Sequence, residues 1–232
     1  MIKEAIVLAG GLGTRLRSAV PDLPKCMAQV SGRPFIDYVI NYFLSAGISR
    51  FIFALGYKHE IIEMHLQDRF PQLNYQCVIE DEPLGTGGAI KLAIGSARTE
   101  DVLILNGDTF FKINLAHLFD FHKQTNSDCT LALKQMKNFD RYGVVGLSPN
   151  NRVNSFHEKK FYEEGLINGG VYILNIKRFT AERFPEKFSF EKDYLEKYYS
   201  AHSMYGHLQA NYFIDIGIPE DYTKAQSEMS IE

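Results

Sequence analysis

A glycine turn followed by cations is the first feature of this chain that could do chemistry. The turn and its flanking residues comprise Leu8, Ala9, Gly10, Gly11, Gly13, Thr14, Arg15, Arg17 and Lys25. Glycines let the backbone come close to a ligand and turn N–H groups toward it, and such groups form a cradle for an anion. The arginines and the lysine add permanent positive charge at the same place. The segment therefore predicts a site for a polyphosphate.

This turn fits neither of two common nucleotide-binding motifs. A P-loop needs a Gly-Lys-Ser/Thr sequence, which does not follow here. The dinucleotide fingerprint needs a third glycine where this chain has Leu16. The alternative interpretation is a tight strand-to-helix turn with two solvated arginines. Lys25 argues against that alternative, because it follows Pro24, whose fixed φ constrains how the lysine approaches.

Two aspartates could bind a metal ion beside this cradle. Asp108 follows the apolar run 102–105, and Asp215 is embedded in apolar residues. A buried aspartate without a partner is costly, so a metal or another cation should lie next to Asp215. Mg²⁺ usually takes one or two carboxylates together with substrate phosphates. We predict that both aspartates bind Mg²⁺; alternatively, Asp108 caps a turn and Asp215 is an N-cap or bonds inside a turn.

A second glycine-rich loop, Pro83–Ala89, leads into a predicted helix and follows three acidic residues. Glu80, Asp81 and Glu82 would repel a phosphate, but carboxylates accept hydrogen bonds from a purine base or from sugar hydroxyls. Glu80 stands at a strand end, where it could accept from N1–H and N2–H₂ of guanine. The alternative is a solvated acidic loop.

The second half of the chain carries groups that suit a sugar phosphate. Gly143 offers a backbone amide with no side chain in the way, and Glu158 and Asn168 offer partners for hydroxyls. Lys159 offers a cation for the phosphate, and Gly169 follows the amide side chain. Taken singly, each of these is equally typical of a turn, a surface charge pair or a hairpin.

The composition narrows the class of protein. The net charge of −3 over 232 residues argues against a nucleic-acid binder, which normally carries a broad basic face. The cysteines, Cys26, Cys77 and Cys129, fit no zinc or disulfide pattern, which indicates reduced thiols. The chain shows no signal peptide and no apolar run long enough to cross a membrane. We therefore expect a cytoplasmic protein without a membrane partner.

The first half alternates between strand and helix patterns. Strands are predicted over 2–8, 50–55, 74–79 and 102–105, and helices over 35–46, 59–70 and 86–97. This alternation, with continuously apolar strands, predicts a parallel sheet covered on both faces. Ligands of such sheets bind beyond the carboxyl ends of the strands, where both glycine loops and Asp108 are expected.

The second half has more strands than helices. Strands are predicted over 129–136, 144–147, 153–158 and 170–175, and helices over 177–184, 190–199 and 219–229. We expect a mixed or antiparallel extension of the same sheet. No linker or repeat interrupts the chain, so we predict one α/β domain, 1–232, with a Rossmann-like, mostly parallel mixed sheet. The aromatic-rich segment 188–213 is either core or the face of a homodimer.

Taken together, these motifs resemble the sugar-1-phosphate nucleotidylyltransferases. The resemblance rests on LAGGLGTRL with LPK, EPLGTGGA, NGD, YGVV, EK, NGGVYIL and IDIGIPEDY, in family order over nearly the whole chain. It implies the nucleotide-diphospho-sugar transferase fold, and a reaction of NTP with sugar 1-phosphate that gives NDP-sugar and pyrophosphate. Mg²⁺ and the cations would neutralise and align two polyanions, so no covalent nucleophile is needed.

The resemblance also implies roles for individual residues. Arg15 would bind the triphosphate, Lys25 the α-phosphate and the sugar phosphate, and Asp108 with Asp215 the Mg²⁺. The nucleotide-binding residues would be Leu8, Ala9, Gly10, Gly11, Gly13, Thr14, Glu80, Gly85 and Thr86. The sugar-phosphate-binding residues would be Gly143, Glu158, Lys159, Asn168 and Gly169. The nucleotide would occupy the half 1–110 and the sugar phosphate the half 111–232.

Within that family, the segments MAQVSGRPFIDYVI and EDEPLGTGGAI resemble the short guanylyltransferases that act on D-glycero-α-D-manno-heptose 1-phosphate for surface polysaccharides such as capsule or lipopolysaccharide. This implies GTP as the nucleotide and no C-terminal β-helix domain. Glu80 stands where thymidylyltransferases usually have glutamine, which counts against thymine and uracil.

Several alternatives stay open at this stage. They include guanylyl transfer to mannose 1-phosphate, thymidylyl transfer to glucose 1-phosphate, uridylyl transfer to N-acetylmuramate 1-phosphate and cytidylyl transfer to an alcohol phosphate. A non-catalytic sugar-nucleotide sensor should lack one of Arg15, Lys25 and Asp108, yet all three are present. A glycosyltransferase would normally show Asp-x-Asp, which Asn106-Gly107-Asp108 is not.

Overall fold

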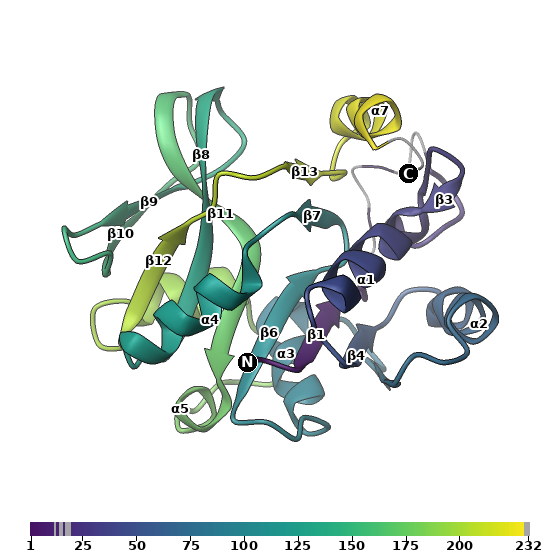
Figure 1. The fold of residues 1–232 in the computed structure, drawn as a ribbon, viewed down its shortest axis with the longest axis horizontal. Coiled ribbons are helices and arrows are strands. Elements are labelled where there is room, and N and C mark those ends of the chain that lie inside the picture. Colours follow the sequence, from purple (N-terminus) through teal and green to yellow (C-terminus); the bar gives the residue numbers. More distant parts are fainter. Residues whose placement is uncertain (12, 14–15, 17–19, 230–232) are drawn as a thin grey trace.

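A nine-stranded mixed sheet forms the centre of the computed structural model, which describes the chain except residues 12, 14–15, 17–19 and 230–232 (Figure 1). The strand order is β10-β9-β11-β6-β1-β4-β5, and β8 pairs with both β11 and β12. The strands are β1 (Glu4–Leu8), β4 (Arg50–Leu55), β5 (Tyr75–Ile79), β6 (Asp101–Asn106), β8 (Cys129–Phe139), β9 (Val144–Leu147), β10 (Val153–His157), β11 (Tyr162–Asn175) and β12 (Met204–Leu208).

The sheet is parallel in its first half and antiparallel where the second half joins it. β1 runs parallel to both β4 and β6, and β4 runs parallel to β5. β11 then lies antiparallel to β6 and to β8. The α/β class and the antiparallel extension predicted from the strand–helix pattern are therefore confirmed.

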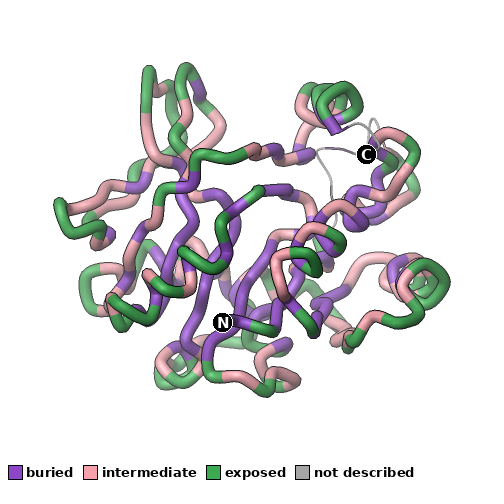
Figure 2. Tube along the Cα trace, viewed as in Figure 1, coloured by how far each residue is buried: buried purple, intermediate pink, exposed green. Residues whose placement is uncertain are grey.

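Helices cover both faces of this sheet. They are α1 (Phe35–Ser45), α2 (His59–Arg69), α3 (Gly85–Ile94), α4 (Leu115–Gln124), α5 (Ile176–Thr180), a π-helical turn η3 (Phe190–Leu195), α6 (Glu196–Tyr198) and α7 (Pro219–Glu228). Successive side chains of a strand point to opposite faces. Val7 accordingly packs in one core with α1 and α2, and Ile6 in the other with α3 and η3. Figure 2 shows the central strands buried and the outer helix surfaces exposed.

Two short strand pairs and a 3₁₀ turn complete the fold. β7 (Thr109–Phe111) pairs antiparallel with β13 (Phe213–Asp215), and β2 (Gln29–Val30) pairs with β3 (Arg33–Pro34). A 3₁₀ turn, η2 (Lys25–Met27), precedes β2. Among the described residues, no helix has both the length and the apolar character that a membrane crossing requires.

The sequence interpretation was wrong about some boundaries in the second half. Helix α4 was not predicted, because only Leu115, Leu118 and His122 of its surface are buried. The strand predicted over 170–175 is the second part of the longer β11, since the pairing register shifts between Asn168 and Tyr172 and the strand continues through this bulge. The predicted helix 190–199 is a π-helical turn followed by the short α6.

Candidate active site

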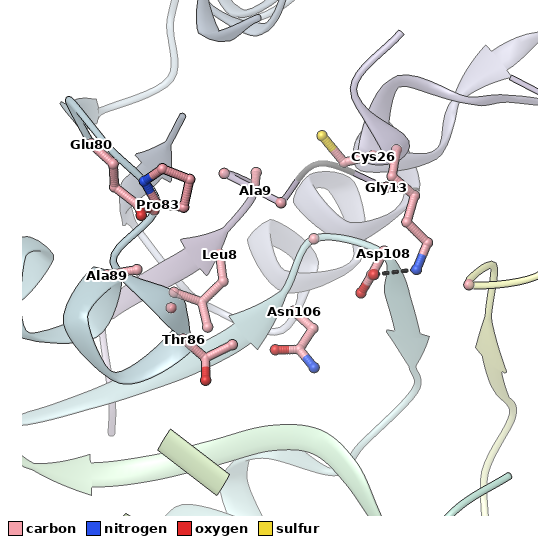
Figure 3. Close-up of a pocket in the computed structure, with 16 residues that line it drawn as sticks. Leu8, Ala9, Gly13, Cys26, Glu80, Pro83, Thr86, Ala89, Asn106 and Asp108 are labelled. Carbon is pink, nitrogen blue, oxygen red and sulfur yellow. Dashed lines mark hydrogen bonds and ion pairs between the residues drawn. The ribbon is translucent and has the colours of Figure 1, made fainter. Parts of the chain in front are cut away.

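The carboxyl ends of β1 and β6 open into a cavity of about 450 Å³ (Figure 3). Leu8 and Asn106 are register partners at these two strand ends, and both line the cavity. Of the predicted site residues, the lining contains Leu8, Ala9, Gly10, Gly11, Gly13, Lys25, Glu80, Gly85, Thr86 and Asp108. The remaining lining residues, which sequence reasoning did not assign, are Cys26, Pro83, Ala89, Asn106, Gly107 and Gly217. Thr14 and Arg15 lie outside the described residues.

Glu80 and Asp108 lie on opposite sides of this cavity (Figure 3). The Oε2 atom of Glu80 accepts a hydrogen bond from the Leu84 backbone N–H at 2.8 Å. A Cβ built on Gly10 would come within 2.6 Å of Glu80 Oε1, so the glycine is what allows the carboxylate to lie against the backbone after β1. Burial raises the pKa of Glu80, and the hydrogen bond from Leu84 opposes this shift. Of the described groups, none donates to Oε1.

The N-terminus of α3 is already bonded to another segment of the chain. The Phe188 carbonyl oxygen accepts from the backbone N–H groups of Gly87 and Gly88, at 3.0 and 3.4 Å. The Thr86 hydroxyl accepts from the Phe190 N–H at 2.9 Å and donates to Glu191 Oε2 at 2.7 Å. The glycines of this loop therefore hold the segment before η3, an arrangement that the sequence did not indicate.

Lys25 joins the two aspartates that the sequence singled out. Its Nζ forms a short ion pair with Asp108 Oδ2 and lies 3.6 Å from Asp215 Oδ1. The lysine side chain is only 10% exposed, so water screens these charges weakly. Burial, followed by the charge of Asp108, raises the pKa of Asp215, while Lys25 and the Gly217 backbone N–H lower it. The cation expected beside Asp215 is thus Lys25 in this structure.

The β7–β13 pair brings these aspartates together from distant parts of the chain. Asp215 pairs in register with Thr109, the residue after Asp108, and the Ile216 N–H donates to the Asp108 carbonyl at 3.0 Å. The Gly217 N–H donates to Asp215 Oδ1 at 2.6 Å. Backbone pairing therefore fixes the spacing of the two carboxylates.

The donor set of Asp108 and Asp215 suits a magnesium ion that also binds substrate. Two buried or half-buried carboxylates at one place repel each other, which favours a cation between them. Among the described residues, no group of three or more acidic, histidine or cysteine side chains is arranged for a metal. Two carboxylates together with phosphate oxygens are what Mg²⁺ prefers, whereas a closed all-protein site would need more ligands.

A second cavity, of about 440 Å³, adjoins the first. Both cavities are lined by Asn106 and Gly217, and Asp215 lines the second. All of the residues predicted to bind the sugar phosphate line it: Gly143, Glu158, Lys159, Asn168 and Gly169. These residues come from the β8–β9 loop, the end of β10 and the bulge of β11. The fold therefore assembles in one place residues that, taken singly, are equally typical of a turn, a surface charge pair or a hairpin.

The bulge in β11 sets the position of the amide side chain in this second cavity. Asn168 Oδ1 accepts from the Gly170 N–H at 3.1 Å, and its Nδ2 donates to the buried Tyr172 hydroxyl at 2.7 Å. Gly170 has a φ of +70°, and a Cβ there would lie 2.6 Å from Asn106 Nδ2. A glycine at position 170 is thus needed to pass the chain close to the end of β6.

Sequence reasoning missed several polar residues of the second cavity. Arg141 lines it and forms a short ion pair with Asp221 of α7, beside the ring of Tyr142. Glu191, Lys192 and Glu196 line it from η3 and α6. The position of Arg141 before Tyr142-Gly143 was a usable signal. For Glu191 there was none, because no motif surrounds it.

Comparison with known proteins agrees with this architecture. The model of the nucleotidyl transferase family matches residues 4–231. A protein of Aneurinibacillus thermoaerophilus described as D-glycero-alpha-D-manno-heptose 1-phosphate guanylyltransferase is 50% identical over 226 residues, covering 97% of this chain and 98% of that protein. A Campylobacter jejuni protein with the same description is 45% identical over 219 residues, covering 94% and 96%.

A solved structure shares the fold over its full length. HddC from Yersinia pseudotuberculosis superimposes with a TM-score of 0.89 at 36% sequence identity, covering 99% of this chain and 100% of that one. A second structure of the same protein, complexed with GMP-PN, gives a TM-score of 0.88. The family match, the full-length relatives and the shared fold lead to one conclusion: this chain belongs to the nucleotidyl transferase family.

Proposed function

We propose that this protein transfers GMP from GTP to D-glycero-α-D-manno-heptose 1-phosphate, giving GDP-heptose and pyrophosphate. The observation that carries the proposal is the junction of the two cavities, where Lys25 lies between Asp108 and Asp215. One cavity is lined by the glycine turn, Lys25 and Glu80, which suit a nucleotide, and the other is lined by partners for hydroxyls and a phosphate. Relatives at 50% and 45% identity carry this activity in their descriptions, and the HddC complex holds a guanine nucleotide analogue.

In the proposed reaction an oxygen of the sugar phosphate attacks the α-phosphorus of GTP. The bond from that phosphorus to the oxygen bridging the β-phosphate breaks, and pyrophosphate leaves with the electron pair. The attacking oxygen is already anionic, so the chain needs no strong general base. Lys25 would stabilise the charge shared between the two phosphates, and Lys159 would hold the sugar phosphate in line. Arg15 would bind the departing phosphates.

Asp108 and Asp215 would hold the Mg²⁺ that the family typically uses. When bound, the ion neutralises phosphate charge and orients the phosphate oxygens. The protein contributes a fixed spacing of the two carboxylates, which the pairing of β7 with β13 maintains. Lys25 would then exchange its contacts with the aspartates for contacts with phosphate.

Glu80 would select guanine. Its Oε2 is fixed by the Leu84 N–H, which leaves Oε1 to accept from the base. The amino and ring N–H groups of guanine form a donor pair that matches a carboxylate, whereas uracil offers a single ring donor. The backbone of residues 8–13 would bind the nucleotide phosphates, with Gly85 and Thr86 against the nucleotide. The halves 1–110 and 111–232 would then divide nucleotide from sugar binding.

GTP and heptose phosphate as substrates imply a cytoplasmic enzyme that supplies activated heptose for surface polysaccharides. The experiment that tests the activity is pyrophosphate release with Mg²⁺, crossing GTP, ATP, UTP, CTP and dTTP against heptose, mannose, glucose and N-acetylmuramate 1-phosphates. Turnover restricted to GTP and the heptose phosphate supports the proposal. Turnover of GTP with mannose 1-phosphate alone would mean that mannose, not heptose, is the sugar of the substrate. Turnover with UTP or dTTP would mean that the enzyme does not select guanine. No release with any pair favours a sugar-nucleotide sensor.

A further inference from the structure

Glu191 is a half-buried carboxylate that reaches the second cavity from the π-helical turn η3. Its Oε2 accepts hydrogen bonds from two hydroxyls, Thr86 Oγ1 at 2.7 Å and Ser189 Oγ at 3.1 Å. Both donors are themselves held, because Thr86 Oγ1 accepts from the Phe190 N–H and Ser189 Oγ accepts from the Lys192 N–H. The carboxylate is therefore locked in one orientation by its own turn and by α3.

The second carboxylate oxygen has no donor within the described part of the chain. Oε2 takes both of the hydrogen bonds found for this side chain, which leaves Oε1 to the cavity. The same cavity is lined by Asn168, whose amide donates to the Tyr172 hydroxyl. Tyr172 lines the same cavity as Glu191 and Asn168, and burial, followed by the charge of Glu191, raises the pKa of Tyr172.

A carboxylate oriented in this way suits a sugar hydroxyl better than a phosphate. An ionised carboxylate only accepts hydrogen bonds, and a hydroxyl is a donor that it can pair with. A phosphate at the same place would be repelled. Because its hydrogen bonds already hold the Glu191 side chain in place, this side chain loses little conformational entropy when a ligand binds.

We infer that Glu191 binds the sugar, accepting a hydrogen bond from one of its hydroxyls through Oε1. The inference rests on the proposed function, since it assigns the second cavity to the sugar. Thr86 is then a positioning residue: it lies against the nucleotide cavity, yet its hydroxyl orients a carboxylate of the sugar cavity. None of the motifs that carry the family resemblance contains Glu191.

The test is the Glu191→Gln variant, which keeps the size of the side chain and removes its charge. The Michaelis constants for heptose 1-phosphate and for GTP are measured separately by pyrophosphate release. A hydrogen bond to a charged group is worth enough to raise the KM for the sugar phosphate between about tenfold and a hundredfold, with the KM for GTP within about twofold of the native value. If Glu191 serves only to hold α3, the KM for GTP rises as much or more, and the inference is overturned. Unchanged constants overturn it as well.

The matched control is Asp193→Asn, in the same turn. Asp193 accepts from the Ser189 N–H and pairs with Lys197, but does not line the cavity. The Asp193→Asn variant should leave the KM for the sugar phosphate unchanged. A rise in this KM equal to that of Glu191→Gln would show that disturbance of the turn causes the effect of both substitutions. If Glu191→Gln does not fold, Glu191→Asp, which withdraws the carboxylate from the cavity by one methylene, replaces it.

Assays of the native enzyme with each sugar phosphate distinguish failure of this inference from failure of the proposed function. If it turns over another sugar phosphate in place of the heptose phosphate, the proposed substrate is wrong, and the Glu191 comparison is made with the sugar phosphate that it does use. A selective rise in that KM then still supports the inference.

Discussion

Lys25 is the residue on which the electrostatics of the site depend most. It is nearly buried between two carboxylates, where a charge is worth more than in water. Burial raises the pKa of Asp215, and the charge of Lys25 opposes this shift. The same ammonium is placed to meet phosphates that enter from either cavity, because it stands at their junction.

Replacing Lys25 by methionine should therefore reduce activity severely. We expect kcat/KM to fall by about 10²–10³-fold, the usual cost of removing one electrostatic contact to a transition state, as measured by pyrophosphate release. The control is Lys197→Met, which removes an exposed lysine paired with Asp193. Loss of activity in both variants, or in neither, would contradict the role of Lys25.

Glu80 gives a second prediction at the residue scale. The Glu80→Gln variant should lose about 10–100-fold in kcat/KM with GTP and change little with UTP, because only guanine offers the paired donors that a carboxylate matches. The measurement is the ratio of the two rates at saturating sugar phosphate. Asp81→Asn, which alters an exposed neighbour outside the first cavity, is the control. If the ratio of the rates with GTP and UTP is the same in Glu80→Gln as in the native protein, Glu80 does not select guanine.

At the scale of elements, the site depends on short strands and bulges added to the ends of the parallel strands. β7 and β13 fix the distance between the aspartates, and the bulge in β11 turns Asn168 toward its cavity. The segment before η3 caps α3, and η3 itself carries Glu191. These connections explain why the two cavities share a wall.

The bulge can be tested with a glycine that has a matched control. Gly170 and Gly32 both have positive φ, but a Cβ on Gly170 would meet Asn106 while a Cβ on Gly32 would meet nothing within 4 Å. Both alanine variants should lose about 1–2 kcal/mol of unfolding free energy from the left-handed backbone. Only Gly170→Ala should also lower kcat/KM, by about tenfold, because a 1 Å shift at a catalytic wall is costly. Equal activity in the two variants would argue against a positioning role for the bulge.

At the scale of the whole molecule, a buried polar network ties the base of the sheet to the helices. Asp101, at the start of β6, lies 3.0 Å from Lys123 Nζ and accepts from Asn175 Nδ2 at 2.8 Å, and His122 Nε2 lies 3.4 Å away. Burial alone would raise the pKa of Asp101, but these hydrogen bonds outweigh it and hold the pKa well below its ordinary value. The network joins α4, β6 and β11.

The pH dependence of stability follows from the sign of this shift. A depressed pKa means that the native state favours the ionised form, so the contribution of Asp101 is full above its unfolded pKa of about 4 and is lost as the pH falls through the lower native value. Asp101→Asn should cost about 3 kcal/mol in urea unfolding at pH 7, and the difference from the native protein should shrink below about pH 4. Asp193→Asn, which removes a pair that also lowers the pKa of its carboxyl, should show a much smaller pH-dependent difference, because that pair is exposed and solvent screens it. A difference for Asp101→Asn that stays constant with pH would exclude the network as its cause.

The sequence by itself determined the local chemistry and the parallel half of the fold. The largely apolar run 50–55 predicts a strand buried on both faces. Glycines beside cations or acids at strand ends predict a ligand site there. Strand–helix alternation then predicts that β1 and β6 end at the same edge. Motifs and the family resemblance assigned Leu8, Lys25, Glu80 and Asp108 to the site, and all four line one cavity.

Only the tertiary structure decided which distant segments meet. Nothing local in the sequence places Asp215 beside Asp108, Phe188 over the glycines of α3, or Glu191 against Thr86. These contacts depend on the register of β7 with β13 and on how η3 packs against α3, and both follow from the shape of a core to which the whole chain contributes. The bulge of β11 escaped prediction for the same reason, since its long-range pairing with β8 outweighed the local pattern. Helix α4 escaped prediction because few of its residues are buried.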